Sequence, residues 1–168
     1  LGVFPPGQTL VLTDFAGFMR VFQRYVEAHH AMVEAIKLND TVDADGDGVA
    51  ATVGLTLSIA DWVPARRNRP SDNEVDVAAA NRMRYIYHFL MIDSILNGTF
   101  DADIDEVPEL SFPELREVMV AEGSGNSTSP LDWLGVQYYF RAGVTGETAL
   151  IRDAGLTPCV NILDFGAC

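Results

Sequence analysis

Residues 131–141 begin as an apolar run and end in polar side chains that could do chemistry. The polar groups are an amide, two phenols and a guanidinium, those of Gln137, Tyr138, Tyr139 and Arg141. This pattern is typical of a buried parallel strand whose carboxyl end presents polar groups at one rim of a sheet. In barrels of alternating strands and helices, that rim carries the chemistry. The structural alternative is an amphipathic strand end whose tyrosines bond to neighbouring backbone.

A second run of strand-forming residues, 53–59, contains the hydroxyl of Ser58 near its end and is followed by Trp62. The loop after it holds Arg66, Arg67 and Arg69. In so acidic a chain we expect these arginines to pair with Asp and Glu side chains rather than to bind a charged ligand.

Asp43, Asp45 and Asp47, followed by Gly48, read as Asp-x-Asp-x-Asp-Gly, which is the first half of a calcium loop. The twelfth position of such a loop would be Gly54 instead of the usual glutamate, so a solvated acidic turn is the alternative. The acidic run at residues 101–106 is expected to be a solvated loop.

These groups must be positioned by alternating helices and strands. The apolar spacing predicts a helix from the N-cap Asp14 to about Leu38, and a second helix from residues 72–73 to Asn97 and Gly98. A short helix is expected from Ser111 through residues 115–119, then the strand at 131–140. Residues 1–7 read as a Pro-Gly loop, and 148–168 show no clear strand. Two strands separated by helices should be parallel, with a right-handed crossover.

The chain has 168 residues, 48% of them hydrophobic, and a net charge of −13. It could fill one domain core, whereas a complete (β/α)8 barrel takes about 250 residues. The acidic balance argues against nucleic-acid and anionic-membrane partners. The two cysteines, Cys159 and Cys168, do not show whether they form a disulfide or in which cellular compartment the protein is found. No targeting or membrane-length segment is visible, which favours a cytoplasmic location.

The sequences of these segments resemble those of glycoside hydrolase family 1, the β-glucosidase family of retaining (β/α)8 glycosidases. Residues 131–139 are similar to its Asp-Phe-(Leu/Ile)-Gly-Val-Asn-Tyr-Tyr strand, and residues 54–58 to its Gly-Ile-Thr-Leu-Asn strand. Two helical segments also match in order and spacing: Ala28-His29-His30, and Ala79-Ala80-Asn81-Arg82 followed by Asp93 and Gly98. Adjacent histidines point to different faces, so His29 and His30 are expected to be packed residues rather than a ligand pair.

The resemblance implies a partial (β/α)8 TIM barrel, about the fifth and sixth βα units with the preceding helix, with residues 1–168 as a single segment incomplete at both ends. It implies a β-glucoside or related oligosaccharide as substrate, no required cofactor, and catalysis by two carboxylates that this chain does not hold at the family positions. The remainder of the barrel would be needed, and the chain alone is expected to be inactive.

By the same resemblance, Tyr139 would donate its hydroxyl to the nucleophilic carboxylate. Gln137 and Ser58 stand where the family has asparagines, so the amide of Gln137 reaches about one methylene further. Trp62 offers a flat face on which a sugar ring can rest, although packing on the rim explains it equally well. The alternatives are a non-catalytic carbohydrate-binding or structural relative, and a small calcium-binding α/β module.

Overall fold

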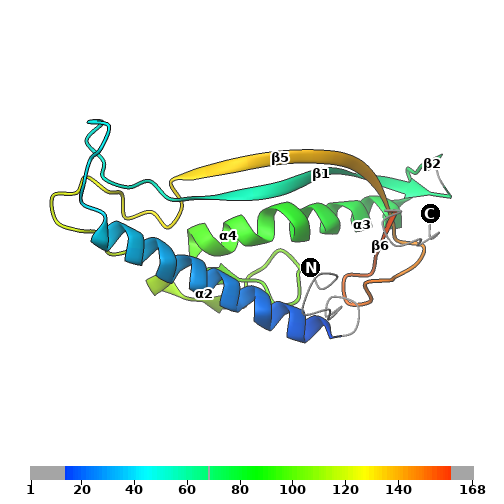
Figure 1. Cartoon of the computed structure of the whole chain (residues 1–168). Coiled ribbons are helices and arrows are strands. Elements are labelled where there is room, and N and C mark those ends of the chain that lie inside the picture. Colours follow the sequence, from blue (N-terminus) through cyan, green and yellow to red (C-terminus); the bar gives the residue numbers. More distant parts are fainter. Residues whose placement is uncertain (1–13, 68, 160–168) are drawn as a thin grey trace.

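The structure is a computed structural model and describes residues 14–67 and 69–159. Two long strands, β1 (Gly54–Arg66) and β5 (Trp133–Thr145), lie side by side, and the helices α3 (Glu74–Arg84) and α4 (Leu90–Asn97) run beneath them (Figure 1). The helix α2 (Phe15–Asn39) lies beyond α4 on the side away from the sheet (Figure 1). The expected loop at residues 1–7 lies outside the described residues.

The predicted parallel pairing of the two strands is confirmed. Their register runs from Gly54 opposite Trp133 to Pro64 opposite Val144. Both strands continue well beyond the predicted ends at Ile59 and Phe140. Because of this, the polar residues at 58 and 137 lie within the strands and not at their ends.

Short edge strands complete the sheet, in the order β2-β1-β5-β6. β2 (Arg69–Pro70) is antiparallel to β1, and β6 (Thr157–Cys159) is antiparallel to β5. The expectation that residues 148–168 lack a strand is therefore wrong at 157–159. A strand of this length is too short to show an alternating pattern in the sequence.

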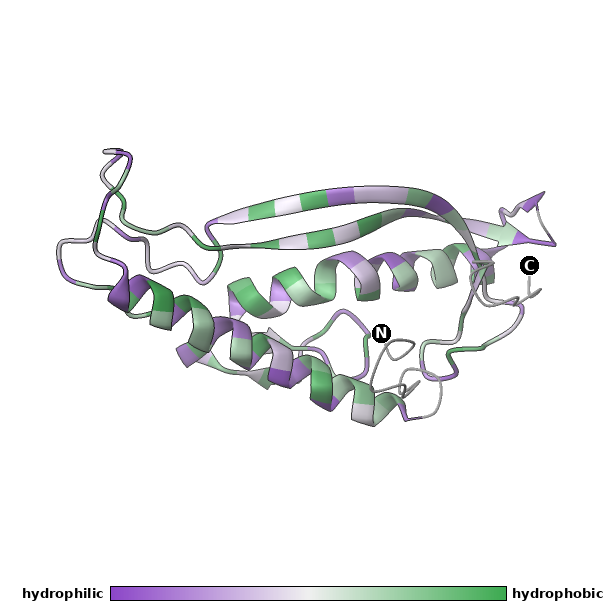
Figure 2. Cartoon of the chain, in the orientation of Figure 1, coloured by the Kyte–Doolittle hydropathy of each residue, from purple (hydrophilic) through white to green (hydrophobic). Residues whose placement is uncertain are grey.

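The helix α2 begins where the sequence predicts, with the Asp14 carboxylate accepting a hydrogen bond from the N–H of Gly17 at 2.8 Å. Apolar and polar residues alternate around it (Figure 2). Its buried apolar stripe consists of Phe18, Met19, Phe22, Val26 and Val33. This stripe faces the core because residues three and four apart share one side of a helix.

The predicted helix from residue 73 to 97 is present but is interrupted by a π-helical turn, η1 (Tyr85–Phe89). Asn73 caps α3, and Gly98 ends α4 with a φ of 57°, as its position predicts. The amide of Leu90 donates to the carbonyl of Tyr85, five residues back. A π turn has no period of its own in the sequence, so the pattern could not reveal it.

The chain between α4 and β5 is mostly irregular. Strands β3 (Thr99–Phe100) and β4 (Leu110–Ser111) pair in antiparallel fashion. The short helix expected through residue 119 is wrong beyond one 3-10 turn, η2 (Pro113–Leu115). The amide of Val118 instead donates to the carbonyl of Thr128 at 2.9 Å, which turns the backbone toward the next loop.

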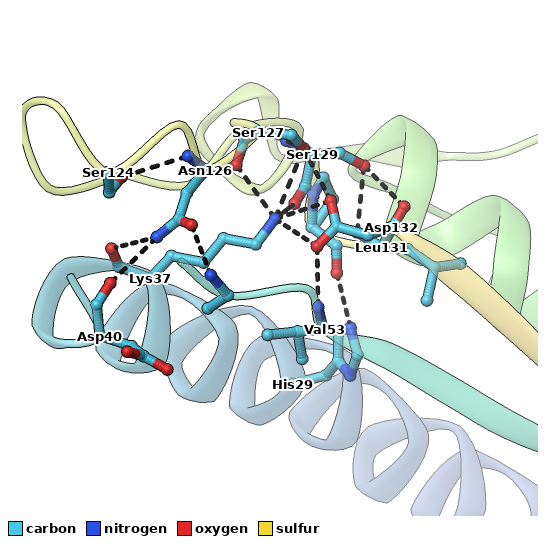
Figure 3. A network of polar contacts seen from close by, with 12 residues as sticks. His29, Lys37, Asp40, Val53, Ser124, Asn126, Ser127, Ser129, Leu131 and Asp132 are labelled. Atoms are coloured by element: carbon cyan, nitrogen blue, oxygen red, sulfur yellow. Dashed lines mark hydrogen bonds and ion pairs between the residues drawn. The ribbon is translucent and has the colours of Figure 1, made fainter. Parts of the chain in front are cut away.

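Lys37, the only lysine of the chain, fixes where β5 begins. It is fully buried, and its ammonium donates to the carbonyls of Ser127 (3.0 Å) and Ser129 (2.8 Å) and to the carboxylate of Asp132 (2.9 Å) (Figure 3). Asp132 in turn exchanges two hydrogen bonds with Val53, each 2.8 Å long. The network therefore ties α2 to the starts of both long strands.

The two adjacent histidines of α2 are packed, as expected. The Nε2 of buried His29 lies 2.9 Å from the carbonyl of Pro130, and the Nε2 of His30 lies 2.8 Å from that of Glu117. Among residues 14–67 and 69–159, no helix is both long and apolar enough to span a membrane.

Candidate functional site

Ser58, Gln137 and Tyr139 come together on the two parallel strands. Ser58 is the ladder partner of Gln137, and the hydroxyl of Tyr139 donates to Oε1 of Gln137 at 2.6 Å. The amide nitrogen of Gln137 remains available as a donor. Three of the residues that the sequence predicts for the site are therefore neighbours in the fold.

A β-bulge sits at Tyr139. The register passes from Ile59 opposite Tyr138 to Ala60 opposite Phe140, so Tyr139 has no ladder partner. A bulge re-aims side chains and breaks the strict alternation of faces. Tyr138 is 60% exposed and Tyr139 62% exposed, so exposure does not distinguish the two phenols. Because of the bulge, Tyr138 and Tyr139 need not face opposite sides of the sheet, as adjacent residues of a regular strand do.

Trp62 lies in the core and not on the rim. Its side chain is only 2% exposed, and its ring makes edge contacts with Tyr87 at 5.2 Å and Phe140 at 5.8 Å between centroids. Its Nε1–H has no hydrogen-bond partner among the described residues. The ring therefore supports β1 and β5 from beneath, next to the bulge, and offers no open face to a ligand in this structure.

Two residues of the π turn contact the site and were not predicted. The hydroxyl of Tyr87 lies 3.1 Å from that of Ser58, and Nε2 of His88 accepts the N–H of Ala60 at 3.2 Å. Burial and the charge of Arg84 lower the pKa of His88, which favours the neutral ring that this acceptor role requires. Nothing in the local sequence marks a π turn, so no signal pointed to them.

Asp76 joins the ends of the two long strands to the start of α3. It is fully buried and accepts from Arg66 (2.9 Å), Thr145 (2.9 Å) and the N–H of Gly146 (2.8 Å). Burial raises the pKa of this carboxyl, but these donors outweigh burial and hold it well below its usual range. Arg67 pairs with Glu147 at 3.6 Å, so two of the three arginines pair as expected.

The rim also carries an exposed ion pair. The guanidinium of Arg141 donates to the carboxylate of Asp61, its ladder partner. Around Ser58, Gln137 and Tyr139 the described side chains supply hydroxyl and amide groups, which can orient a polyol or a carboxylate by hydrogen bonds. They cannot by themselves supply the paired acid and nucleophile that glycoside hydrolysis needs.

The two acidic loops have the same pattern of backbone hydrogen bonds, each within its own loop. Asp43 accepts from backbone N–H groups three, four and five residues ahead, those of Gly46 (2.7 Å), Asp47 (3.2 Å) and Gly48 (2.8 Å). Asp101 accepts at the same offsets, from Ile104 (2.6 Å), Asp105 (3.3 Å) and Glu106 (2.8 Å). Residues 101–105 repeat the Asp-x-Asp-x-Asp pattern of residues 43–47, and this repeat was the sequence feature that could have predicted the second loop.

Both loops gather carboxylates in a way that suits a hard cation. The carboxylate oxygens of Asp43, Asp45 and Asp47 lie within 4.8 Å of one another, as do those of a second group, Asp101, Asp103, Asp105 and Glu109. The pKa of Asp43 is lowered, mainly by the hydrogen bond that its carboxylate accepts from the N–H of Gly48. The lowered pKa keeps the Asp43 carboxylate ionised. The first loop still lacks a glutamate at its twelfth position, Gly54.

The sequence is similar to those of two known glycosidases. No family profile matches the chain. It is 31% identical over 125 residues to a β-glucosidase from an Agrobacterium species, covering 70% of this chain and 24% of that enzyme. It is 27% identical over 164 residues to the β-galactosidase of Pyrococcus woesei, covering 97% of this chain and 28% of that enzyme. The chain is a distant homologue of the family 1 β-glucosidases and β-galactosidases.

The fold agrees with this homology. A rice β-glucosidase superposes with a TM-score of 0.61 at 16% identity, covering 94% of this chain and 34% of that one. A mutant of the same rice enzyme, solved in a covalent complex with Glc, superposes with a TM-score of 0.59. The chain thus has a mixed α/β fold matching part of a family 1 TIM-barrel enzyme, and it spans about a quarter to a third of the length of these relatives.

Proposed function

We propose that this chain forms part of a retaining β-glycosidase acting on β-glucosides or related oligosaccharides. Within the barrel, residues 1–168 would be a single segment holding about the fifth and sixth βα units and the helix before them. The observation that carries the proposal is the cluster of Ser58, Gln137 and Tyr139 on neighbouring parallel strands, in a chain homologous to β-glucosidases over most of its length.

In a retaining mechanism, two carboxyl groups about 5 Å apart flank the glycosidic bond. One attacks the sugar, and the other protonates the leaving oxygen and then activates water. The rest of the barrel would supply both. Tyr139 would exchange its present bond to Gln137 for one to the nucleophile, which keeps that carboxylate ionised and oriented. Gln137 and Ser58 would then bind sugar hydroxyls.

Trp62 has a different role in this proposal from the one that the sequence suggests. Since its ring packs against Phe140, the residue after Tyr139, it would hold the bulge in place rather than stack on substrate. We propose it as a positioning residue. The neutral His88, which accepts from Ala60 on the opposite side of the bulge, would act in the same way.

The test is hydrolysis of an aryl β-glucoside by the full-length protein that contains this chain. We expect turnover with retention of the anomeric configuration, and none from the 168-residue chain alone. Turnover by the chain alone would show that its own groups suffice. A full-length protein that binds glucosides without hydrolysing them would instead be the non-catalytic relative, and one that does neither would refute the proposal.

We also propose that the loop of Asp43, Asp45 and Asp47 binds calcium (Ca²⁺). Carboxylates at alternating positions, closed around a turn with Gly48 at a φ of 93°, provide the hard oxygen ligands that calcium prefers. The ion would stabilise the turn between α2 and β1, remote from the reaction, and glycoside hydrolysis would not require it.

A further inference from the structure

A cavity of about 360 Å³ lies between the helix η1–α4 and the segment joining β3 to β4. From the helix it is lined by Tyr85, Phe89, Asp93 and Ser94, whose spacing brings them to one face across the π turn. From the segment it is lined by Asp101 and Glu106. It shares no residue with the Ser58, Gln137 and Tyr139 cluster.

The cavity is acidic. Three carboxylates line it and no basic residue does. Asp101 is 1% exposed and accepts the hydroxyl of Tyr85 at 2.8 Å together with three backbone N–H groups, so only neutral donors stabilise its charge. The Asp93 side chain is exposed at the mouth of the cavity and has neither a hydrogen bond nor an ion pair with any described residue. Partial desolvation raises its pKa. A cation bound there would give this carboxylate the partner that it lacks.

Ser94 adds a hydroxyl group to the lining of the cavity. Its side chain is 2% exposed, and its hydroxyl has no hydrogen bond within the described part of the chain. Among the described residues only Nε1 of Trp62 is both buried and without a hydrogen bond, so the Ser94 hydroxyl is reached from the open space of the cavity and is available to a ligand there. A donor inside the cavity would satisfy it.

The aromatic rings decide which cation fits. Tyr85 and Phe89 offer ring faces or edges to the same space, and ammonium groups bind to ring faces while their alkyl stems pack on apolar surface. A bare calcium ion needs six to eight oxygen ligands at about 2.3–2.6 Å and makes no use of rings. The volume is that of a small organic ligand site, for which about 300 Å³ is the lower bound.

We propose that this cavity binds an aliphatic primary ammonium group. The ammonium donates to Asp93, to the hydroxyl of Ser94 and to Glu106, and the methylene stem lies along Phe89. The end of a diamine and the amino group of an amino sugar both carry this chemistry. The site does not depend on the proposed glycosidase activity.

The test is isothermal titration of the 168-residue chain with 1,5-diaminopentane, with 1,5-pentanediol as the neutral match and glucosamine as the second amine. We expect saturable binding of the diamine, at least about tenfold tighter than that of the diol, from the summed ion-pair and cation–π terms. Preference for glucosamine over the diamine assigns the site to an amino sugar. Equal binding of diamine and diol overturns the proposal.

Variants locate the binding. Asp93→Asn should weaken the diamine about threefold or more, and Ser94→Ala about two- to tenfold. Glu114→Gln removes one exposed carboxylate outside the cavity and should leave the affinity unchanged. Circular dichroism of each variant checks folding. An affinity unchanged in Asp93→Asn, or lowered equally in Glu114→Gln, would show that the amine only follows the net charge of the chain.

Discussion

Two neighbouring phenols on β5, Tyr138 and Tyr139, differ in their contacts and not in their exposure. In the full-length protein we expect Tyr139→Phe to lower kcat/KM roughly ten- to a hundredfold, since a hydrogen bond to a charged group is worth about 1.5–3 kcal/mol. Tyr138→Phe serves as the matched control and should change the rate little. If both variants lose the rate equally while remaining folded, the role belongs to neither phenol in particular.

Asp76 shows how one buried carboxylate joins three elements. Asp76→Asn keeps the shape but weakens the bonds to Arg66 and Thr145, so we expect it to lower the free energy of unfolding by about 2–4 kcal/mol. Urea denaturation at pH 7 measures this. Asp72→Asn, four residues earlier and exposed, should cost less than about 0.5 kcal/mol.

The same carboxylate sets an acid dependence. Its folded pKa lies below the ordinary value of 3.8, so its contribution to stability is complete above that value and falls as the pH drops toward the folded pKa. The wild-type chain should therefore lose stability more steeply below pH 4 than Asp76→Asn. If the free energy of unfolding falls with pH at the same slope in both proteins, groups other than Asp76 determine the loss of stability in acid.

At the scale of elements, the attachment of α2 to β5 depends on Lys37 and Asp132. Burial raises the pKa of Asp132, but the hydrogen bonds from Lys37, Val53 and Ser127 and the charge of Lys37 together outweigh burial and leave the pKa lowered. We expect Lys37→Met to cost about 3 kcal/mol, because it removes the charge that compensates a half-buried carboxylate. The double variant with Asp132→Asn should cost less than the sum of the two single changes. Additive costs would show that the two groups act independently.

The acidic loop between α2 and β1 gives the second prediction at this scale. Calcium at 100 times its dissociation constant would add about 2.7 kcal/mol, which raises the Tm by roughly 5–10 °C for a chain of this size. Asp43→Asn should abolish the shift, whereas Asp103→Asn in the second loop should preserve it. An equal shift with magnesium would show a site for divalent cations in general rather than for calcium, and no shift with calcium would identify the turn as a solvated one.

The helices followed from the sequence because each carries a long periodic pattern, and the parallel pair followed from two strand-forming runs separated by helices. Asp14, Asn73 and Gly98 end their helices by local hydrogen bonding and backbone preference, which can be read from the sequence. The π turn, the bulge at Tyr139 and the burial of Trp62 depend on contacts between distant segments. Such contacts leave no local pattern, so the site residues could be named but their orientations could not.

At the scale of the whole molecule, the sheet is open. Within the described residues β1 pairs with β2 only at 65–66, and β5 pairs with β6 only at 143–145. Along the remaining lengths, neither outer edge has a strand beside it among residues 14–67 and 69–159. Exposed apolar and aromatic residues gather on β5: Trp133, Leu134, Val136 and the two tyrosines. Such edges are what we expect of the barrel segment proposed above.

Open edges and exposed apolar side chains favour association between copies, although the charge of −13 opposes it. We therefore expect the 168-residue chain to associate increasingly with concentration, and with salt, which screens the repulsion. Val136→Lys places a charge on the open strand and should shift the sedimentation profile toward monomer. Val42→Lys adds the same charge on an exposed loop residue away from the sheet, so it separates the effect of the strand from that of net charge. A wild-type chain that stays monomeric in high salt, or equal dispersal by both variants, would show that the exposed strand does not drive association.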